Sequence, residues 1–189
     1  MNPNKRRAIF LDRDGVINAV VLREGKPYPP QSLTDLIIPD EVLPALNLLK
    51  KAGFLLIVVT NQPDIARGQA TQASVDDIHQ HLLKQLPLDD IRVCAHDDKD
   101  RCICRKPQAG LLTQAAQDYN IKLDESYMIG DRWRDIEAGQ TAGCKSIFLD
   151  YGYLEKKPES PDYIAQSLQQ AAEYINKSVG NNNETSIRS

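Results

Sequence analysis

Short apolar runs, each leading into polar residues, recur along the sequence. Three of them predict strands that are buried on both faces, namely residues 8–11, 54–59 and 127–130. Two further runs, 91–93 and 146–149, also predict strands. Ligands of open α/β sheets bind at the carboxyl ends of the strands. The pattern therefore places the candidate chemistry at one edge of a sheet.

Between these runs, apolar residues recur at helical spacing. Val42, Leu46 and Leu49 predict a helix over residues 41–52, with Asp40 as its N-cap. Further helices are predicted over residues 74–86 with Ser74 as N-cap, over 109–120, over 135–139 and over 164–175. The alternation of strands and helices predicts an α/β fold with a doubly wound parallel sheet.

A length of 189 residues suits one domain with a proper core. We expect this domain over residues 1–176, followed by a flexible tail over 177–189 that is rich in Asn and Ser. Residues 19–38 contain several prolines and predict an irregular flap beside the end of the first strand. No internal repeat and no second domain are predicted.

Composition narrows the classes of function. The chain is 41% hydrophobic and 26% charged, with a formal net charge of −3, so a sequence-independent nucleic-acid binder is disfavoured. No apolar run approaches a membrane span, and the basic start lacks the apolar core of a signal peptide. We expect a cytoplasmic monomer with no nucleic-acid or membrane partner.

Asp12 ends the first apolar run, and Asp14 follows two positions later. Alternate residues of an extended segment point the same way, so both carboxylates can face one point, where they repel each other unless a cation lies between them. Oxygen ligands of this kind suit Mg²⁺, and one carboxylate can serve as a nucleophile. A polar turn without chemistry is the alternative, and these residues alone leave it open.

A second cluster of candidate ligands lies in residues 94–104. Cys94 and His96 form one pair, and Cys102 and Cys104 form another across a polar loop. Three thiolates and an imidazole are a complete tetrahedral set for Zn²⁺, without an open position for catalytic water. We predict a structural zinc loop, with chance clustering as the alternative. Its cysteines agree with a reducing compartment.

Further polar residues follow the other strands. Thr60, Asn61 and Gln62 come directly after the run 54–59, and Arg105 and Lys106 follow the zinc loop. A bound zinc ion would fix the conformation of the loop, and the loop would in turn fix the positions of Arg105 and Lys106.

Asp131 follows the run 127–130, where a metal ligand is favoured over a helix cap. Arg132 comes next, and Asp135 lies one helical turn further on, where it can support the metal site. His79 and His81 lie on a predicted helix and are interpreted as solvated or half-buried bystanders.

The order of these motifs resembles that of the haloacid-dehalogenase superfamily of phosphohydrolases. The motifs are Asp12-Arg13-Asp14-Gly15-Val16-Ile17-Asn18, Thr60-Asn61-Gln62, Cys104-Arg105-Lys106-Pro107 and Gly130-Asp131. The resemblance covers nearly all of residues 8–150. The zinc-loop pattern is similar to that of a branch without a cap domain, which includes heptose 1,7-bisphosphate and histidinol-phosphate phosphatases.

The resemblance implies a Mg²⁺-dependent phosphomonoesterase that works through an aspartyl-phosphate, with Asp12 as nucleophile and Asp14 as acid and base. It implies Mg²⁺ ligands from Asp12, Asp14 and Asp131, and substrate contacts from Thr60, Asn61, Gln62, Arg105, Lys106 and Arg132. The Zn²⁺ ligands would be Cys94, His96, Cys102 and Cys104.

Two stretches depart from the family pattern, Val20-Val21-Leu22 and Pro63-Asp64, and the zinc loop is shorter than in well-known members. These departures lie where the distal end of a substrate would sit, so they concern the identity of the substrate and not catalysis.

For the substrate we expect a heptose 1,7-bisphosphate. Arg23, Arg105 and Arg132 supply more cations than one transferred phosphate requires, which suggests a second anionic group. A histidinol-phosphate or other polyol-phosphate phosphatase is the alternative enzyme. A catalytically silent zinc- and phosphate-binding module is the alternative from another class, and the intact acidic motifs argue against it.

Overall fold

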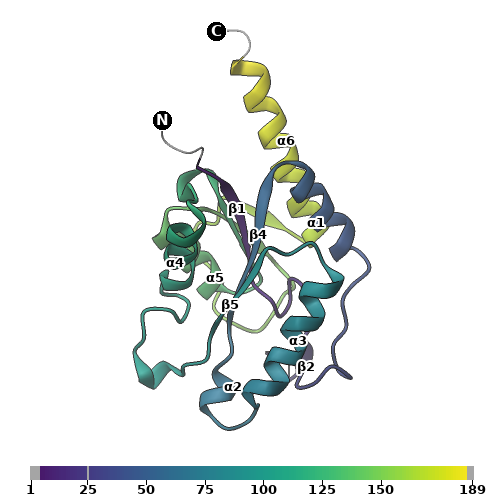
Figure 1. Ribbon diagram of the computed structural model, residues 1–189, viewed down its shortest axis with the longest axis vertical. Helices are drawn as coiled ribbons and strands as arrows, with labels where there is room; N and C mark the ends of the chain where they lie inside the picture. Colours follow the sequence, from purple (N-terminus) through teal and green to yellow (C-terminus); the bar gives the residue numbers. More distant parts are fainter. Residues whose placement is uncertain (1–4, 25, 187–189) are drawn as a thin grey trace.

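A parallel sheet forms the centre of the computed structural model, which describes residues 5–24 and 26–186 (Figure 1). The strands are β1 (Arg7–Leu11), β4 (Phe54–Asn61), β5 (Asp90–Cys94), β6 (Tyr127–Gly130), β7 (Lys145–Leu149) and β8 (Tyr163–Ala165). They lie in the order β5-β4-β1-β6-β7-β8, and every neighbouring pair is parallel. Numbered among themselves, these strands have the order 3-2-1-4-5-6, that of a doubly wound sheet.

Helices cover both faces of this sheet (Figure 1). The helices α1 (Val42–Lys51), α3 (Gln72–Gln85) and α6 (Leu168–Ser186) lie on one side, and α4 (Gly110–Tyr119) and α5 (Trp133–Ala142) lie on the other. The remaining helical segments are short: α2 (Pro63–Ala66) and two 3₁₀ turns, Asp98–Asp100 and Leu123–Glu125. The α/β fold with a doubly wound parallel sheet is confirmed.

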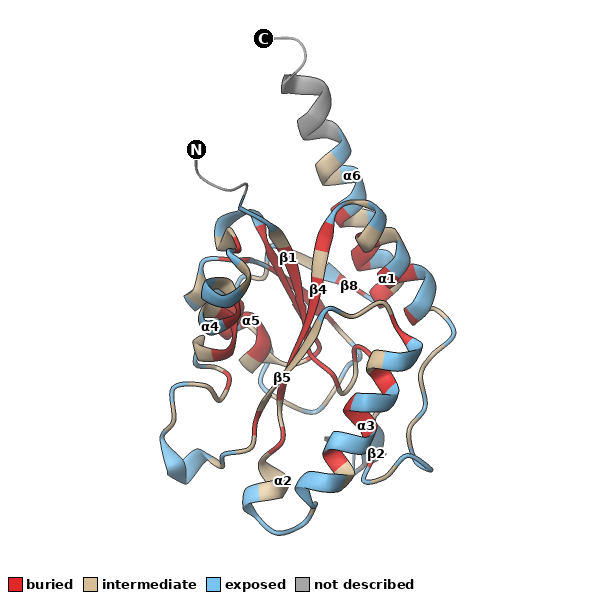
Figure 2. Ribbon diagram, in the orientation of Figure 1, coloured by how far each residue is buried: buried red, intermediate tan, exposed pale blue. Residues whose placement is uncertain are grey.

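Two apolar clusters fill the space between sheet and helices, because successive side chains of a strand point to opposite faces. In β1, Ile9 and Leu11 join the cluster under α1, α3 and α6, whereas Ala8 and Phe10 join the cluster under α4 and α5. These four residues are fully buried, and Figure 2 shows β1 and β4 as the buried centre of the molecule. A strand buried on both faces explains why its sequence is an unbroken apolar run.

The predicted irregular flap contains a hairpin. β2 (Val21–Arg23) and β3 (Lys26–Tyr28) pair in antiparallel fashion as a separate two-stranded sheet. The prediction for this segment is therefore wrong in part. Three-residue strands are too short to show an alternating pattern, and Pro27 argued against a strand although an edge position tolerates it.

Several predicted helix ends are displaced. Glu41, and not Asp40, is the N-cap of α1, and it makes no capping side-chain hydrogen bond. Thr71, and not Ser74, caps α3, and its hydroxyl accepts a hydrogen bond from the Ser74 N–H at 3.1 Å. The prediction of a helix over 164–175 missed strand β8, and α6 extends to Ser186 through most of the segment predicted as a tail.

The switch point of the sheet lies where the chain leaves β1 for β4 on one side and later reaches β6 on the other. In open α/β sheets this is the place where ligands bind. The described residues include no separate cap domain above it.

None of the helices in the described part of the chain is long and apolar enough to cross a membrane.

Candidate active site

Three carboxylates converge at this switch point. Asp12 follows β1, Asp131 follows β6, and Asp135 lies in the first turn of α5. One oxygen from each lies within 4.8 Å of the others. Gly15, with φ +88°, permits the approach, because a Cβ atom there would lie 1.9 Å from Asp131 Oδ2. The turn after β1 therefore requires glycine for two reasons: its backbone conformation and the space that Asp131 occupies.

Lys106 lies among these carboxylates and is 2% exposed. Its Nζ donates to Asp12 Oδ1 at 2.8 Å and lies 2.6 Å from Asp135 Oδ1. Burial alone would lower the pKa of Lys106, but the charges of Asp12 and Asp135 raise it above its usual value. Lys106 therefore stays protonated, and it can neutralise an incoming anion at this point.

The pKa of Asp12 is raised from 3.8 to about 6, because burial disfavours its charged form more than the charge of Lys106 favours it. Burial and the charge of Asp12 also raise the pKa of Asp131 well above its usual value. Three carboxylates therefore share one ammonium group in a buried place. The negative charge of the cluster therefore exceeds its positive charge.

Among the described residues the Asp131 carboxylate makes no ion pair, and the nearby Tyr153 and Arg132 side chains lower its pKa less than burial raises it. Both of its oxygens are buried and lack a hydrogen-bond partner among the described residues. It does not cap α5, because Asp135 Oδ2 accepts the hydrogen bond from the Arg132 N–H at 3.0 Å. A buried, unpartnered carboxylate beside two others fits a hard divalent cation that takes oxygen ligands, such as Mg²⁺.

Asn61 positions Lys106 through its backbone. The Asn61 Nδ2 donates to the Lys106 carbonyl, and the Lys106 N–H donates to Asn61 Oδ1, both at 3.0 Å. These two bonds connect the end of β4 to the segment after the cysteine-rich loop. Asn61, which was predicted to contact the substrate, thus lies at the site. Its side-chain amide forms hydrogen bonds with the backbone of Lys106.

The Asp14 carboxylate is held by five hydrogen bonds. It accepts from Arg13 Nε at 3.1 Å and from Arg13 Nη2 at 2.9 Å on each oxygen. Asn18 Nδ2 donates at 3.0 Å and Gln62 Nε2 at 2.8 Å. Gln62 also donates to the Thr60 hydroxyl at 2.9 Å, so that the residues after β4 are connected to Asp14. Asp14 is absent from the cluster of three converging carboxylates described above.

A small cavity of about 80 Å³ lies in front of these groups. It is lined by Asp12, Asp14, Asn61, Lys106, Asp131, Arg132, Arg134 and Asp135, together with the flap residues Val20, Pro27, Tyr28 and Pro29. The flap predicted to touch a bound molecule therefore borders the site. Arg23, the flap residue predicted to contact an anionic group of the substrate, has a side chain that is outside the described part of the structure.

The two arginines predicted to contact the substrate differ in their positions relative to the cavity. Arg105 points into the cysteine-rich loop, where its Nε donates to Asp98 Oδ1 at 2.8 Å, and it does not line the cavity. Arg132 does line the cavity, but its guanidinium is paired with Glu155. Arg134, which we did not single out, lines the cavity and donates to Asp98 Oδ1 at 3.0 Å.

His79 is a further correction. It is buried at 6% exposure, and its Nε2 lies 2.9 Å from Arg13 Nη1, so the prediction of a solvated or half-buried bystander is wrong. The signal available for Arg134 is its place in the first turn of α5, the helix that follows Asp131. No pattern in the sequence pointed to the contact of His79 with Arg13.

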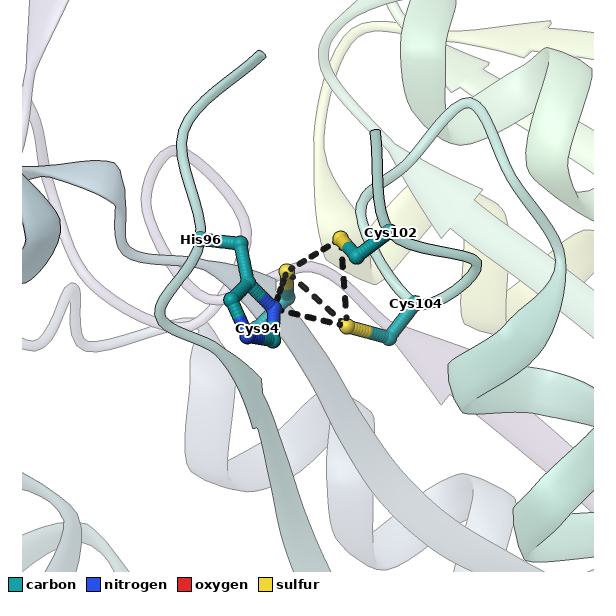
Figure 3. Close-up of side chains that lie close together, drawn as sticks. All are labelled: Cys94, His96, Cys102 and Cys104. Atoms are coloured by element: carbon teal, nitrogen blue, oxygen red, sulfur yellow. Dashed lines mark hydrogen bonds between the residues drawn. The ribbon is translucent and has the colours of Figure 1, made fainter. Parts of the chain in front are cut away.

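The cysteine-rich loop brings its four predicted ligands together, as Figure 3 shows. The Sγ atoms of Cys94, Cys102 and Cys104 lie 3.1–3.6 Å apart, and His96 Nδ1 lies 3.6 Å from Cys94 Sγ and 3.3 Å from Cys104 Sγ. These sulfur distances exceed a disulfide bond of about 2.05 Å. They approach the separation of about 3.7 Å expected for tetrahedral ligands with zinc–sulfur bonds of about 2.3 Å. The cluster could form a zinc site.

Comparison with known proteins agrees with this geometry. A family model described as HAD-hydrolase-like matches residues 103–171. The D-glycero-beta-D-manno-heptose-1,7-bisphosphate 7-phosphatase of Helicobacter pylori is 37% identical over 85% of this chain and 91% of its own. The chain belongs to this family of HAD phosphatases. It is therefore a phosphoric monoester hydrolase, as the motifs implied.

Other members of the family differ in the anomer that they are named for. The D-glycero-alpha-D-manno-heptose-1,7-bisphosphate 7-phosphatase of Photorhabdus laumondii is 35% identical over 89% of this chain and 96% of its own. The crystal structure of the D,D-heptose 1,7-bisphosphate phosphatase from B. bronchiseptica, complexed with magnesium and phosphate, has a TM-score of 0.78. It is 29% identical and covers 91% of this chain and 99% of its own. HAD phosphatases use Mg²⁺, and this chain has the carboxylates for it.

Proposed function

We propose that the chain removes the 7-phosphate from D-glycero-D-manno-heptose 1,7-bisphosphate, through a phosphorylated aspartate at Asp12. Family membership supports the substrate. The observation that carries the proposal is the buried group of Asp12, Lys106 and Asp131, in which neither oxygen of Asp131 has a hydrogen-bond partner among the described residues. A purely structural cluster would pair such a carboxylate.

The proposed reaction begins with attack of an Asp12 oxygen on phosphorus, in line with the leaving oxygen of the sugar. Asp14 gives a proton to that oxygen and later takes one from the water that hydrolyses the phosphorylated Asp12. Lys106 neutralises charge on the phosphoryl oxygens. Gln62 supports Asp14 by a hydrogen bond and is itself hydrogen-bonded to the Thr60 hydroxyl, and Asn61 keeps Lys106 in place.

Asp12, the backbone carbonyl of Asp14, and Asp131 would hold Mg²⁺, which supplies further positive charge to the phosphoryl group. Asp135 reaches the same cluster but already pairs with Lys106, so we assign it the support of that lysine. In the loop, Zn²⁺ would take Cys94, His96, Cys102 and Cys104 and would have a structural role. Lys106 lies two positions after Cys104, so the loop contributes to placing the lysine.

A second phosphate on the substrate finds its partners beside this loop. Arg105 and Arg134 share one carboxylate, that of Asp98, so the three groups together have a net positive charge. Arg132 and Glu155, by contrast, pair one to one. The Asp98 side chain is 58% exposed, and exposed pairs of this kind contribute only about 0–1 kcal/mol. A phosphate can therefore replace Asp98 as the partner of Arg105 and Arg134.

Phosphate release from a set of substrates tests this function. We expect the highest kcat/KM with the heptose 1,7-bisphosphate, lower values with sugar monophosphates, and the lowest with histidinol phosphate, all in the presence of Mg²⁺. Both anomers of the bisphosphate belong in the set, and phosphorus NMR of the product shows whether the 1-phosphate remains. Equal rates with histidinol phosphate would contradict the argument for a second anionic group. An absence of phosphate release from every ester would contradict an enzymatic function.

We also propose that the protein acts as a cytoplasmic monomer. The four cysteines are all free, which suits a reducing compartment. Sedimentation of the purified protein tests the oligomeric state.

A further inference from the structure

Arg13 occupies an unusual place for a charged side chain. It lies between the two aspartates of the first motif, is 0% exposed, and heads the residues with the largest fully buried side chains. Burying a guanidinium is costly unless it is paired and hydrogen-bonded. Its partners therefore indicate why it is there.

Two groups receive its hydrogen bonds. On one side, Nε and Nη2 hold both oxygens of Asp14 at 2.9–3.1 Å, a two-pronged arrangement that fixes the plane of the carboxylate. On the other side, Nη1 lies 2.9 Å from Nε2 of His79. The guanidinium thus connects the proposed acid and base of the reaction to a helix outside the site.

His79 comes from α3 and lies 66 residues along the chain from Arg13. Burial and the neighbouring charge of Arg13 lower the pKa of His79 to about 4. The imidazole is therefore neutral near pH 7, and its Nε2 accepts the hydrogen bond because an arginine can only donate. The proton of the neutral ring then lies on Nδ1.

The backbone of the turn adds a second restraint. The Arg13 carbonyl accepts hydrogen bonds from the N–H groups of Ile17 and Asn18 at 2.8 and 3.1 Å. The backbone of Arg13 is thus fixed, but this leaves the direction of its long side chain open. Among the described residues, His79 is the one outside the acidic motif that forms a hydrogen bond with the guanidinium, and it does so from the side opposite Asp14.

We propose that His79 is a positioning residue for Asp14, acting through the guanidinium of Arg13. His79 holds Nη1, so that Nε and Nη2 face Asp14 and keep its carboxylate turned to the cavity. The inference rests on the proposed function, in which Asp14 protonates the leaving oxygen. Packing alone does not require an imidazole here, since a leucine would fill the space without the cost of burying a polar ring.

Three variants test the proposal. His79→Leu removes the acceptor, whereas His79→Gln offers an amide oxygen at a similar reach. His81→Leu changes an exposed histidine of the same helix and serves as the matched control. Each is measured with two substrates, the sugar phosphate that the wild type hydrolyses best and 4-nitrophenyl phosphate.

A comparison of two leaving groups distinguishes a role of His79 in positioning Asp14 from a role in packing alone. A sugar alkoxide needs a proton from Asp14 in order to leave, but nitrophenolate does not, so the two esters differ in their dependence on that residue. The comparison uses kcat/KM, because this quantity reports the transfer of the phosphoryl group to Asp12. It does not report the later hydrolysis of the phosphorylated Asp12. We expect His79→Leu to lower this quantity roughly tenfold or more for the sugar phosphate and less than threefold for the nitrophenyl ester. His79→Gln should recover most of the loss, and His81→Leu should behave as the wild type.

An equal loss with both esters in His79→Leu, or no recovery in a folded His79→Gln, would overturn the positioning role. A wild-type protein without phosphatase activity would instead contradict the proposed function. The melting temperature of each variant is measured alongside. If His79 positions Asp14, the ratio of the two kcat/KM values changes even in a variant whose melting temperature does not.

Discussion

The molecule contains two clusters of potential metal ligands, and they are constructed in opposite ways. The carboxylates of Asp12, Asp131 and Asp135 are buried and come from distant parts of the chain, whereas the Cys/His cluster lies within residues 94–104 and is partly exposed. The first is assembled by the sheet and the helix α5, since Asp12 and Asp131 lie just beyond strand ends and Asp135 lies in the first turn of α5. The second lies at the margin of the core: Cys94 is buried in it, Cys102 and Cys104 pack against it, and His96 is exposed.

This difference indicates what each metal would contribute. The carboxylate cluster forms with the fold, and a cation there relieves repulsion that the fold has already created. The Cys/His cluster lies in a loop whose regular structure is limited to one short turn, so a bound metal would itself hold the loop together. In the function proposed above, the first cluster would serve chemistry and the second would serve the placement of Lys106.

The largest effect is expected at the carboxylate cluster. Asp12→Asn replaces the proposed nucleophile with an amide, so kcat should fall on the order of 10⁴-fold or more while the fold is retained. Phosphate release and far-ultraviolet circular dichroism measure the two properties. Asp124→Asn, at an exposed position, is the control. Substantial Mg²⁺-dependent turnover in Asp12→Asn would exclude the covalent mechanism.

Breaking the other cluster should have a smaller effect on catalysis. Cys102→Ser removes a proposed zinc ligand, so the purified protein should lose its single Zn²⁺, and Lys106 should lose part of its support. A displacement of about 1 Å in such a group can reduce the rate about 100-fold. Metal analysis and kcat/KM for the bisphosphate are the measurements, and added Mg²⁺ should not restore activity. Cys144→Ser, which alters the buried cysteine outside the cluster, should keep its zinc. Wild-type protein purified without chelators and found free of zinc would refute the zinc loop.

The dependence of stability on pH sharpens the comparison. Because the pKa of Asp12 is raised from 3.8 to about 6, the native state binds more protons than the unfolded state between these values. The free energy of unfolding of the metal-free protein should therefore fall as the pH rises through this window, by about 3 kcal/mol from this group.

Mg²⁺ needs the deprotonated carboxylates, so the stabilisation that it provides should grow over the same window. Urea unfolding at pH 4.5 to 7.5, with and without Mg²⁺, measures this. Asp131→Asn should abolish the effect of Mg²⁺ on stability, because it removes a proposed ligand. An effect of Mg²⁺ that is the same at all these pH values would contradict the assignment of the cation to this cluster.

The smallest effect concerns the region between the clusters. Arg134→Ala should lower kcat/KM for the bisphosphate about tenfold, the effect of losing about 1.5 kcal/mol from a charge-assisted contact. Activity with 4-nitrophenyl phosphate should be nearly unchanged, since that ester has no second phosphate. Lys156→Ala is the control, because Lys156 and Arg134 both lie 4.9 Å from the Trp133 ring but only Arg134 lines the cavity. The same loss with both esters would exclude Arg134 as a partner of the second phosphate.

The fold was predictable because its strands are buried on both faces. An apolar run such as Phe54–Val59 admits few other interpretations, and the polar residues that follow β1, β4 and β6 did converge at one edge. The strands that escaped prediction, β2, β3 and β8, are short and partly exposed, so they lack that continuous apolar signal.

The candidate site was predictable to the extent that its residues are close in sequence or lie at strand ends. The four ligands of the loop follow from spacing alone, and Asp131 follows from its position after β6. The direction of a long side chain does not follow from sequence. Arg105 contacts Asp98 outside the cavity, and Arg13 reaches His79 across 66 residues, because such contacts depend on how helices pack on the sheet.

The pair of hydrogen bonds between Asn61 and the backbone of Lys106 has a consequence for how this chain can vary. One end of the loop is fixed at Cys94 by the pairing of β5 with β4, and the other is fixed at Lys106 by Asn61, also at the end of β4. The loop is thus anchored twice to a single strand. We therefore expect that residues inserted or deleted around Asp98–Asp100 would change the length of the loop while the two anchor points keep the lysine in place.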